Sequence, residues 1–224
     1  MKAYVITLTG NDYSEACAAR CIQSAADHGL EVSAFEAVPA DMALDTMHAH
    51  GLKWTWAKNN TAPDVCPITG LKQHPYGRLS PKIGCSMSHY LLWNRCAIDD
   101  EPLLILEHDA VFLRPLPEVD FNGICMINDP AGATPRWQWW SEQMQQRGPG
   151  IFLKTRVFDG DRPDGLAGNS AYLIKPWAAH QLIDLFHRIG VWPNDATMCV
   201  QLLPYLQELY PFVTCVKQEQ STSS

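Results

Sequence analysis

The feature that most constrains the fold is a run of four aliphatic residues, LLIL at 103–106, which leads directly into the acidic motif Glu107-His108-Asp109. A short continuous apolar run is typical of a strand that is buried on both faces of a parallel α/β sheet. Side chains two residues apart leave a strand on the same side, so Glu107 and Asp109 are expected to face one space. The sequence therefore predicts a central strand that ends in two carboxylates at the ligand-binding edge of its sheet.

The rest of the chain alternates predicted strands and helices, as an α/β protein does. Strands are predicted at residues 2–8, 30–37, 123–128, 170–174 and 212–216, and helices at 12–28, 81–98, 176–189 and 196–206. Asp12 and Glu15 have capping-box spacing, so the first helix is expected to begin with Asp12 as its cap. The prediction is an open, mainly parallel sheet with helices on both faces.

Two segments show no steady hydrophobic period. Residues 40–79 are expected to form an irregular insertion, and residues 136–150 a loop with at most a helical turn, inside a Trp-rich region at about 130–165. The length fits one domain over residues 1–217, followed by a polar tail at 218–224.

Composition excludes several classes of protein. The chain has 46% hydrophobic residues, which excludes a disordered chain, and its net charge of −7 gives no general attraction to nucleic acid or anionic membranes. No apolar run approaches the roughly 20 residues of a membrane span, and the N-terminus lacks a signal-peptide layout. Eight cysteines without a CxxC pair are expected to be reduced and buried. These features predict a soluble cytoplasmic protein.

Two further motifs flank the acidic motif. GCSMSH at residues 84–89 precedes LILEHDA at 104–110 by a helix, and GNSAYLI follows at 168–174. In this order, the segments resemble glycosyltransferase family 25, the lipooligosaccharide-biosynthesis and collagen-galactosyltransferase group. The combination of G-C-x-x-S-H with L-x-L-E-x-D-A is what makes the resemblance specific, and it extends over nearly the whole chain.

The resemblance implies a GT-A type fold and the transfer of a hexose, most often galactose or glucose, from a UDP-sugar with inversion. Glu107 and Asp109 fall on the metal and diphosphate motif, and hard oxygen ligands of this kind suit Mn²⁺ or Mg²⁺. The residues implied to bind the donor and its metal are Thr7, Leu8, Thr9, Lys82, Ser88, Glu107 and Asn169.

Two positions depart from the family pattern. Lys82 stands where an acidic residue is usual, which suggests a contact to phosphate, and His108 replaces the second acid of the motif. These departures leave open a second hypothesis, a catalytically silent module that binds a nucleotide-sugar without turning it over.

An inverting transfer requires a base that accepts the proton of the acceptor hydroxyl. Asp195 matches the late acid of the family and is the first candidate, although an Asp at a helix start is equally often an N-cap. Asp129, which follows a predicted strand, is the second candidate. His89 is the third, with a packed core histidine as its alternative. A zinc site from His48, His50, Cys66 and His74 is disfavoured because their spacing matches no standard pattern.

The acceptor is less defined than the donor. Three tryptophans at 137–140 suit stacking on a sugar or a base, or anchoring of a long loop. Residues 136–162 form a mildly basic region that could meet an anionic acceptor. A glycan such as lipooligosaccharide is the first expectation, and a protein side chain or a modified nucleobase, as glycosylated by some viruses, is the alternative. No stable membrane insertion is expected.

Overall fold

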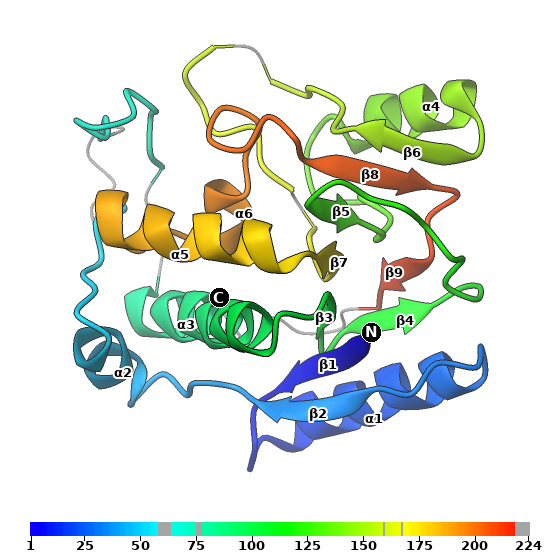
Figure 1. The fold of residues 1–224 in the computed structure, drawn as a ribbon, viewed down its shortest axis with the longest axis horizontal. Helices are drawn as coiled ribbons and strands as arrows, with labels where there is room; N and C mark the ends of the chain where they lie inside the picture. Colours follow the sequence, from blue (N-terminus) through cyan, green and yellow to red (C-terminus); the bar gives the residue numbers. More distant parts are fainter. Residues whose placement is uncertain (58–63, 75–77, 159, 167, 218–224) are drawn as a thin grey trace.

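The computed structural model describes residues 1–57, 64–74, 78–158, 160–166 and 168–217. Nine strands lie in these ranges: β1 (Lys2–Thr7), β2 (Ser33–Glu36), β3 (Leu103–Glu107), β4 (Ala110–Phe112), β5 (Ile124–Met126), β6 (Gly150–Leu153), β7 (Ala171–Ile174), β8 (Gln207–Tyr210) and β9 (Thr214–Val216). Seven of them form one sheet in the order β2-β1-β3-β7-β5-β8-β6, and β4 pairs with β9 (Figure 1).

The strand directions explain where a ligand can bind. β1 runs parallel to β2 and β3, and β5 runs parallel to β8, whereas β7 is antiparallel to both β3 and β5. Because β7 is reversed, its first residues lie at the same edge as the carboxyl end of β3. The N–H of Glu107 donates to the carbonyl of Ser170 at 2.8 Å across this edge.

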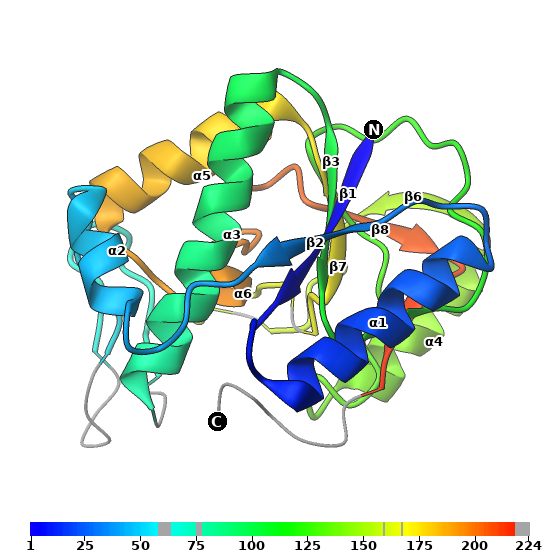
Figure 2. The ribbon, with the colours of Figure 1, turned by 90° about the horizontal axis from the view of Figure 1, so that it is seen from below.

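Six helices complete the described fold: α1 (Asp12–Ala26), α2 (Ala43–Ala49), α3 (Leu79–Asp99), α4 (Trp137–Arg147), α5 (Pro176–Ile189) and α6 (Asn194–Thr197). α1 covers one face of the sheet, and α3 and α5 cover the other (Figure 2). Within β3, Leu104 and Leu106 pack in the core on the α1 side, whereas Leu103 and Ile105 pack in the core on the other side. The predicted open α/β sheet with helices on both faces and its doubly buried central strand are confirmed. The sheet is mixed, because β7 runs antiparallel to β3 and β5, and β6 runs antiparallel to β8.

The predicted cap of the first helix is wrong by one residue, although α1 begins at Asp12 as predicted. The side chain of Asn11 caps α1, because its oxygen accepts a hydrogen bond from the N–H of Ser14 at 2.9 Å. The carboxylate of Glu15 accepts a hydrogen bond from the N–H of Gly10 at 2.7 Å and forms no capping box with Asp12. Asn caps a helix as well as Asp does, so the sequence spacing alone favoured the wrong residue.

The predicted loop at residues 136–150 is wrong, because α4 is a helix of 11 residues. Trp140 and Met144, one turn apart, are both fully buried, and Gly148 ends the helix with a φ of 76°. Packing of these two side chains stabilises a Gln-rich helix whose sequence shows little amphipathic pattern. The predicted irregular insertion at 40–79 contains the short helix α2.

The predicted helix at residues 196–206 is also wrong, because α6 ends at Thr197. The N–H of Leu166 donates to the carbonyl of Met198, and the N–H of Val200 donates to the carbonyl of Asp164. These backbone groups therefore bond to a segment distant in sequence and are not available for a helix. Strands β4, β6 and β8 were not predicted from the sequence.

Other expectations concern the surface and the thiols. All eight cysteines are free, and six of them are buried, as predicted. Within the described ranges, no helix is both long and apolar enough to cross a membrane. The predicted polar tail at 218–224 lies outside the described residues.

Candidate active site

A cavity of about 500 Å³ opens at the carboxyl ends of β3 and β5 and the start of β7. Segments from six parts of the chain supply its wall: Lys82, Cys85 and Ser86 from α3; Glu107 and Asp109 at the end of β3; Asp129 and residues 131–133 after β5; residues 168–170 before β7; residues 193–195; and Val216 in β9. Six of the residues predicted from the sequence thus share one cavity. We call it the donor cavity.

Asp109 is the buried acid of this cavity. Its side chain is 5% exposed, and its Oδ1 atom has no hydrogen-bond partner among the described residues. Burial, followed by the negative charge of Glu107, raises the pKa of Asp109 to about 7. A buried carboxylate oxygen without a donor is compensated well by a cation, so this pair of carboxylates fits a divalent metal ion.

Glu107 is held by two hydrogen bonds. Nε2 of His89 lies 3.3 Å from Oε1, and the hydroxyl of Ser170 donates to Oε2 at 3.4 Å. Burial acts to raise the pKa of Glu107, but the hydrogen bond from His89 and nearby positive charges outweigh it and leave that pKa below its usual value. Glu107 is therefore the ionised member of the pair.

His89 belongs to a buried chain of hydrogen bonds. The indole N–H of Trp93 donates to the hydroxyl oxygen of Tyr172 at 2.8 Å, and that hydroxyl lies 2.9 Å from Nδ1 of His89. Since Tyr172 already accepts from Trp93, its proton is directed to Nδ1, which leaves Nε2 of His89 to carry a proton toward Glu107. His89 is fully buried and stacks on Tyr172, so it positions Glu107 without lining the donor cavity.

Asp195 and Lys82 line the same cavity as the acidic motif. Burial raises the pKa of Asp195, and the positive charge of Lys82 opposes that shift. One carboxylate oxygen of Asp195 accepts from the N–H of Ala196 at 2.9 Å, so the residue makes a local helix-start contact and also lines the donor cavity. Asp195 is not the N-cap of α6, because the helix begins at Asn194 and its cap position is Pro193, without a side-chain cap hydrogen bond. Its place in the cavity wall is compatible with the role of a base.

Asn169 and Asp129 complete the polar wall. Asn169 is 5% exposed, and its side-chain oxygen Oδ1 has no hydrogen-bond partner among the described residues. Asp129 accepts from the N–H of Ala131 at 3.0 Å in a local turn. Asn169 therefore offers an unused buried acceptor to a ligand hydroxyl, whereas Asp129 shares its carboxylate with its own turn.

The remaining predicted residues are distributed differently. Leu8, Ser88 and His89 line a smaller adjoining cavity of about 140 Å³, together with His108. Thr7 and Thr9 line neither cavity, and the hydroxyl of Thr7 donates to the carbonyl of Val5. A β-strand alternates its side chains, so only one of these three neighbouring residues faces the cavity.

A model of glycosyltransferase family 25, described as an LPS biosynthesis protein family, matches residues 1–119, which include both carboxylates and the GCSMSH segment. The chain belongs to glycosyltransferase family 25. The similarity also extends weakly to a solved structure, mouse xyloside xylosyltransferase 1 in its apo form, with 10% identity, a TM-score of 0.43, and coverage of 92% of this chain and 83% of that chain. Among curated proteins, none matches this chain.

The matched region of this family 25 glycosyltransferase also contains its departures from the family pattern. His108 turns toward α1, where its Nδ1 atom lies 3.2 Å from the hydroxyl of Ser14, and burial lowers its pKa. Lys82 stays in the donor cavity, as a phosphate contact would require. The substitution of His for the second acid therefore removes no carboxylate from the donor cavity.

Sequence reasoning missed several residues of the family 25 site. Cys85, Asn194 and Ser170 line the donor cavity, and Tyr172 and Trp93 orient His89 behind it. Within the described part of the chain, the potential metal ligands that gather within 4.8 Å are Cys85, His89 and Glu107. The spacing of Cys85 and His89, one helical turn apart, was visible in the sequence, but their approach to Glu107 was not.

Two tryptophans of the Trp-rich region of this glycosyltransferase differ in burial. Trp140 is fully buried, with Nζ of Lys154 4.3 Å from its ring centre, which is the anchoring role. Trp139 is 43% exposed. The predicted basic region is not continuous in space, because Lys154 is buried.

Proposed function

We propose that this glycosyltransferase transfers a hexose, galactose or glucose, from a UDP-sugar to a hydroxyl of a glycan acceptor with inversion. The observation that carries the proposal is the gathering of Glu107, Asp109, Asp195 and Lys82 around one cavity at the ligand-binding edge of the sheet. Membership of family 25, which implies a nucleotide-sugar donor, supports it independently.

The donor diphosphate is proposed to lie over the acidic pair. Glu107 and Asp109 would hold Mn²⁺ or Mg²⁺, for which the unpartnered Oδ1 of Asp109 is the strongest support. A bound divalent ion would neutralise the charge that develops on the departing diphosphate. Lys82 in the same cavity would add a cationic contact to phosphate, and Asn169 would accept a hydrogen bond from a sugar hydroxyl.

The transfer is proposed to be a single displacement. The acceptor oxygen forms its bond to the anomeric carbon as the bond from that carbon to UDP breaks, and the hydroxyl proton passes to the carboxylate of Asp195. A pKa raised by burial makes Asp195 a stronger base than an ordinary aspartate. Asp129 is a weaker candidate because its carboxylate accepts a hydrogen bond within its own turn.

The donor assay comes first. Purified protein is incubated with UDP-, GDP- and CMP-sugars, with Mn²⁺ or with EDTA, and free nucleotide is measured. We expect release from UDP-galactose or UDP-glucose that EDTA abolishes. Silence across the panel would overturn the proposal, and a thermal shift by a nucleotide without any release would favour the inactive binding module.

Variants then separate the roles of the carboxylates. Glu107→Gln and Asp109→Asn are expected to lower Mn²⁺-dependent turnover at least a hundredfold, whereas Asp195→Asn should lower transfer and leave donor affinity within about twofold. Asp184→Asn is the matched control, because this carboxylate is exposed on α5. Full transfer by Asp195→Asn would exclude Asp195 as the base.

A further inference from the structure

A further cavity, of about 200 Å³, adjoins the donor cavity and is distinct from the cavity of about 140 Å³ beside Leu8. Its wall includes Trp56, Phe158, Arg162, Gly165 and Asp195. We propose that it is the acceptor subsite, and that it selects a sugar bearing an anionic substituent, a carboxylate or a phosphate, through Arg162. This inference rests on the proposed function and specifies its acceptor.

Asp195 connects the two cavities, since it lines both of them. The segment that carries Arg162 lies against Asp195, because a Cβ atom on Gly165 would overlap the carbonyl oxygen of Asp195. The N–H of Leu166 also donates to the carbonyl of Met198, three residues beyond Asp195. An acceptor in this cavity would therefore present its hydroxyl to the proposed base from a cavity that Glu107 and Asp109 do not line.

The net charge at this cavity depends on which of the nearby acidic residues already form ion pairs. Asp161 lies 2.8 Å from the ammonium of Lys72, and Asp164 lies 3.2 Å from the buried ammonium of Lys154. Among the described residues, Arg162 makes no ion pair. The segment 161–164 therefore presents a guanidinium that forms no ion pair within the described ranges, and guanidinium binds carboxylate and phosphate with two parallel hydrogen bonds.

Aromatic rings supply the rest of the wall. The indole N–H of Trp56 donates to the carbonyl of His74 at 2.6 Å, and its ring packs edge-on against Trp192 at 5.0 Å between centres. Phe158 is partly exposed at the cavity. A fixed ring and a partly exposed ring in one cavity wall suit contact with the apolar face of a pyranose.

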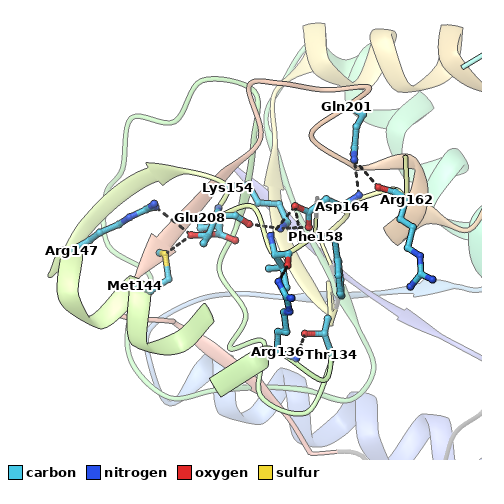
Figure 3. Close-up of polar contacts among 12 residues, drawn as sticks. Thr134, Arg136, Met144, Arg147, Lys154, Phe158, Arg162, Asp164, Gln201 and Glu208 are labelled. Carbon is cyan, nitrogen blue, oxygen red and sulfur yellow. Dashed lines mark hydrogen bonds and ion pairs between the residues drawn. The ribbon is translucent and has the colours of Figure 1, made fainter. Parts of the chain in front are cut away.

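Buried polar contacts hold the wall rigid. Asp164, which is 1% exposed, accepts from the N–H of Val157 at 2.8 Å and pairs with Lys154. Its own N–H donates to the side chain of Gln201, whose amide donates to the carbonyl of Arg162 at 2.6 Å (Figure 3). The backbone of Arg162 is thus fixed before an acceptor arrives, which reduces the entropy lost on binding.

Three methyl glycosides with the same ring test the inference: the β-glucoside, the β-glucuronide and the β-glucoside 6-phosphate. Their dissociation constants for the full chain are measured by ligand-observed NMR. We expect at least one anionic glycoside to bind about tenfold more tightly than the neutral glucoside, and the tighter of the two identifies the substituent. Arg162→Gln should abolish this preference, and Phe158→Ala should weaken all three glycosides.

Arg156→Gln is the matched control, because this arginine is exposed on the same segment and does not line the cavity. Equal binding of the neutral and anionic glycosides, no binding of any of them, or an unchanged preference in Arg162→Gln would each overturn the inference. Failure of the proposed function is a separate result, because it is read from UDP-sugar hydrolysis without any glycoside.

Discussion

Nε2 of His89 lies 3.3 Å from Oε1 of Glu107, so a fully buried imidazole on α3 orients the first carboxylate after β3. The chain of hydrogen bonds continues from His89 through Tyr172 to Trp93. Neither Tyr172 nor Trp93 lines the donor cavity. Partners of this kind behind a ligand-binding carboxylate fix its direction and thereby its affinity for a cation.

Replacing Tyr172 by Phe tests this orientation. The variant keeps the ring that stacks on His89 but leaves Nδ1 of His89 and the indole N–H of Trp93 without a partner. We expect the apparent affinity for Mn²⁺ in UDP-sugar hydrolysis to fall about 10- to 100-fold. Tyr205→Phe is the control, because the buried hydroxyl of Tyr205 has no hydrogen-bond partner in the part of the chain that the structure describes. Equal Mn²⁺ affinity in both variants would contradict the positioning role.

The raised pKa of Asp109 predicts how stability depends on pH. Between about pH 4 and pH 7, the folded protein keeps a proton that the unfolded chain releases, since burial raises the pKa of Asp109 to about 7. The free energy of unfolding therefore decreases with rising pH in this window, by up to about 1.4 kcal/mol per pH unit, and levels off above it.

Asp109→Asn removes this dependence because an amide does not ionise. In urea unfolding at pH 5 and pH 7.5, the stability of the variant relative to wild type should increase by about 2 kcal/mol at the higher pH. Mn²⁺ should restore wild-type stability more at pH 7.5 than at pH 5, because the ion binds the ionised carboxylate. A parallel pH dependence of the two proteins would contradict the assignment.

The buried ion pair of Lys154 and Asp164 is expected to govern the stability of the acceptor side. Asp164→Asn leaves the ammonium of Lys154, which is 0% exposed, without its counter-charge, and a broken buried pair lowers the free energy of unfolding by about 3–5 kcal/mol. The control is Asp120→Asn, which removes a fully exposed partner of Lys175 and should have no measurable effect. Similar unfolding midpoints for the two variants would refute the prediction.

Ser88 is expected to act in folding and not in donor binding. Its buried hydroxyl accepts from the N–H of Val38 at 2.9 Å and donates to the carbonyl of Gly84 at 2.8 Å. Ser88→Ala leaves the N–H of Val38 unsatisfied, so the free energy of unfolding should fall by about 1–3 kcal/mol. UDP affinity, measured by calorimetry, should stay within twofold of wild type.

Ser86→Ala is the complementary variant. The hydroxyl of Ser86 bonds one turn back to the carbonyl of Lys82, and the residue lines the donor cavity. Its stability should change little, because no backbone group loses its partner. A drop in UDP affinity for Ser88→Ala but not for Ser86→Ala would contradict the prediction and indicate that Ser88 binds the donor.

Local pattern was sufficient for the elements that carry a complete signal in their own residues. The aliphatic run of β3 predicted a strand buried on both faces, and α5 begins at Pro176 and ends before Gly190 at the predicted positions. The same local geometry predicted that Glu107 and Asp109 share a space, since alternation along a strand does not depend on distant residues.

Segments whose backbone or side chains are satisfied by distant partners were not predictable in this way. α4 is helical because Trp140 and Met144 are buried, and α6 stops at Thr197 because the next residues bond to 164–166. The contacts of Glu107 with His89 and of Asp164 with Lys154 likewise depend on tertiary packing.

The sequence by itself thus determined the central strand, its two carboxylates and the family. Only the tertiary structure decided which side chains orient Glu107 and which cavity lies beside Asp195. The physical reason is that propensity and periodicity act over a few neighbouring residues, whereas a cavity is the space left where segments far apart in the sequence fail to fill the volume between them.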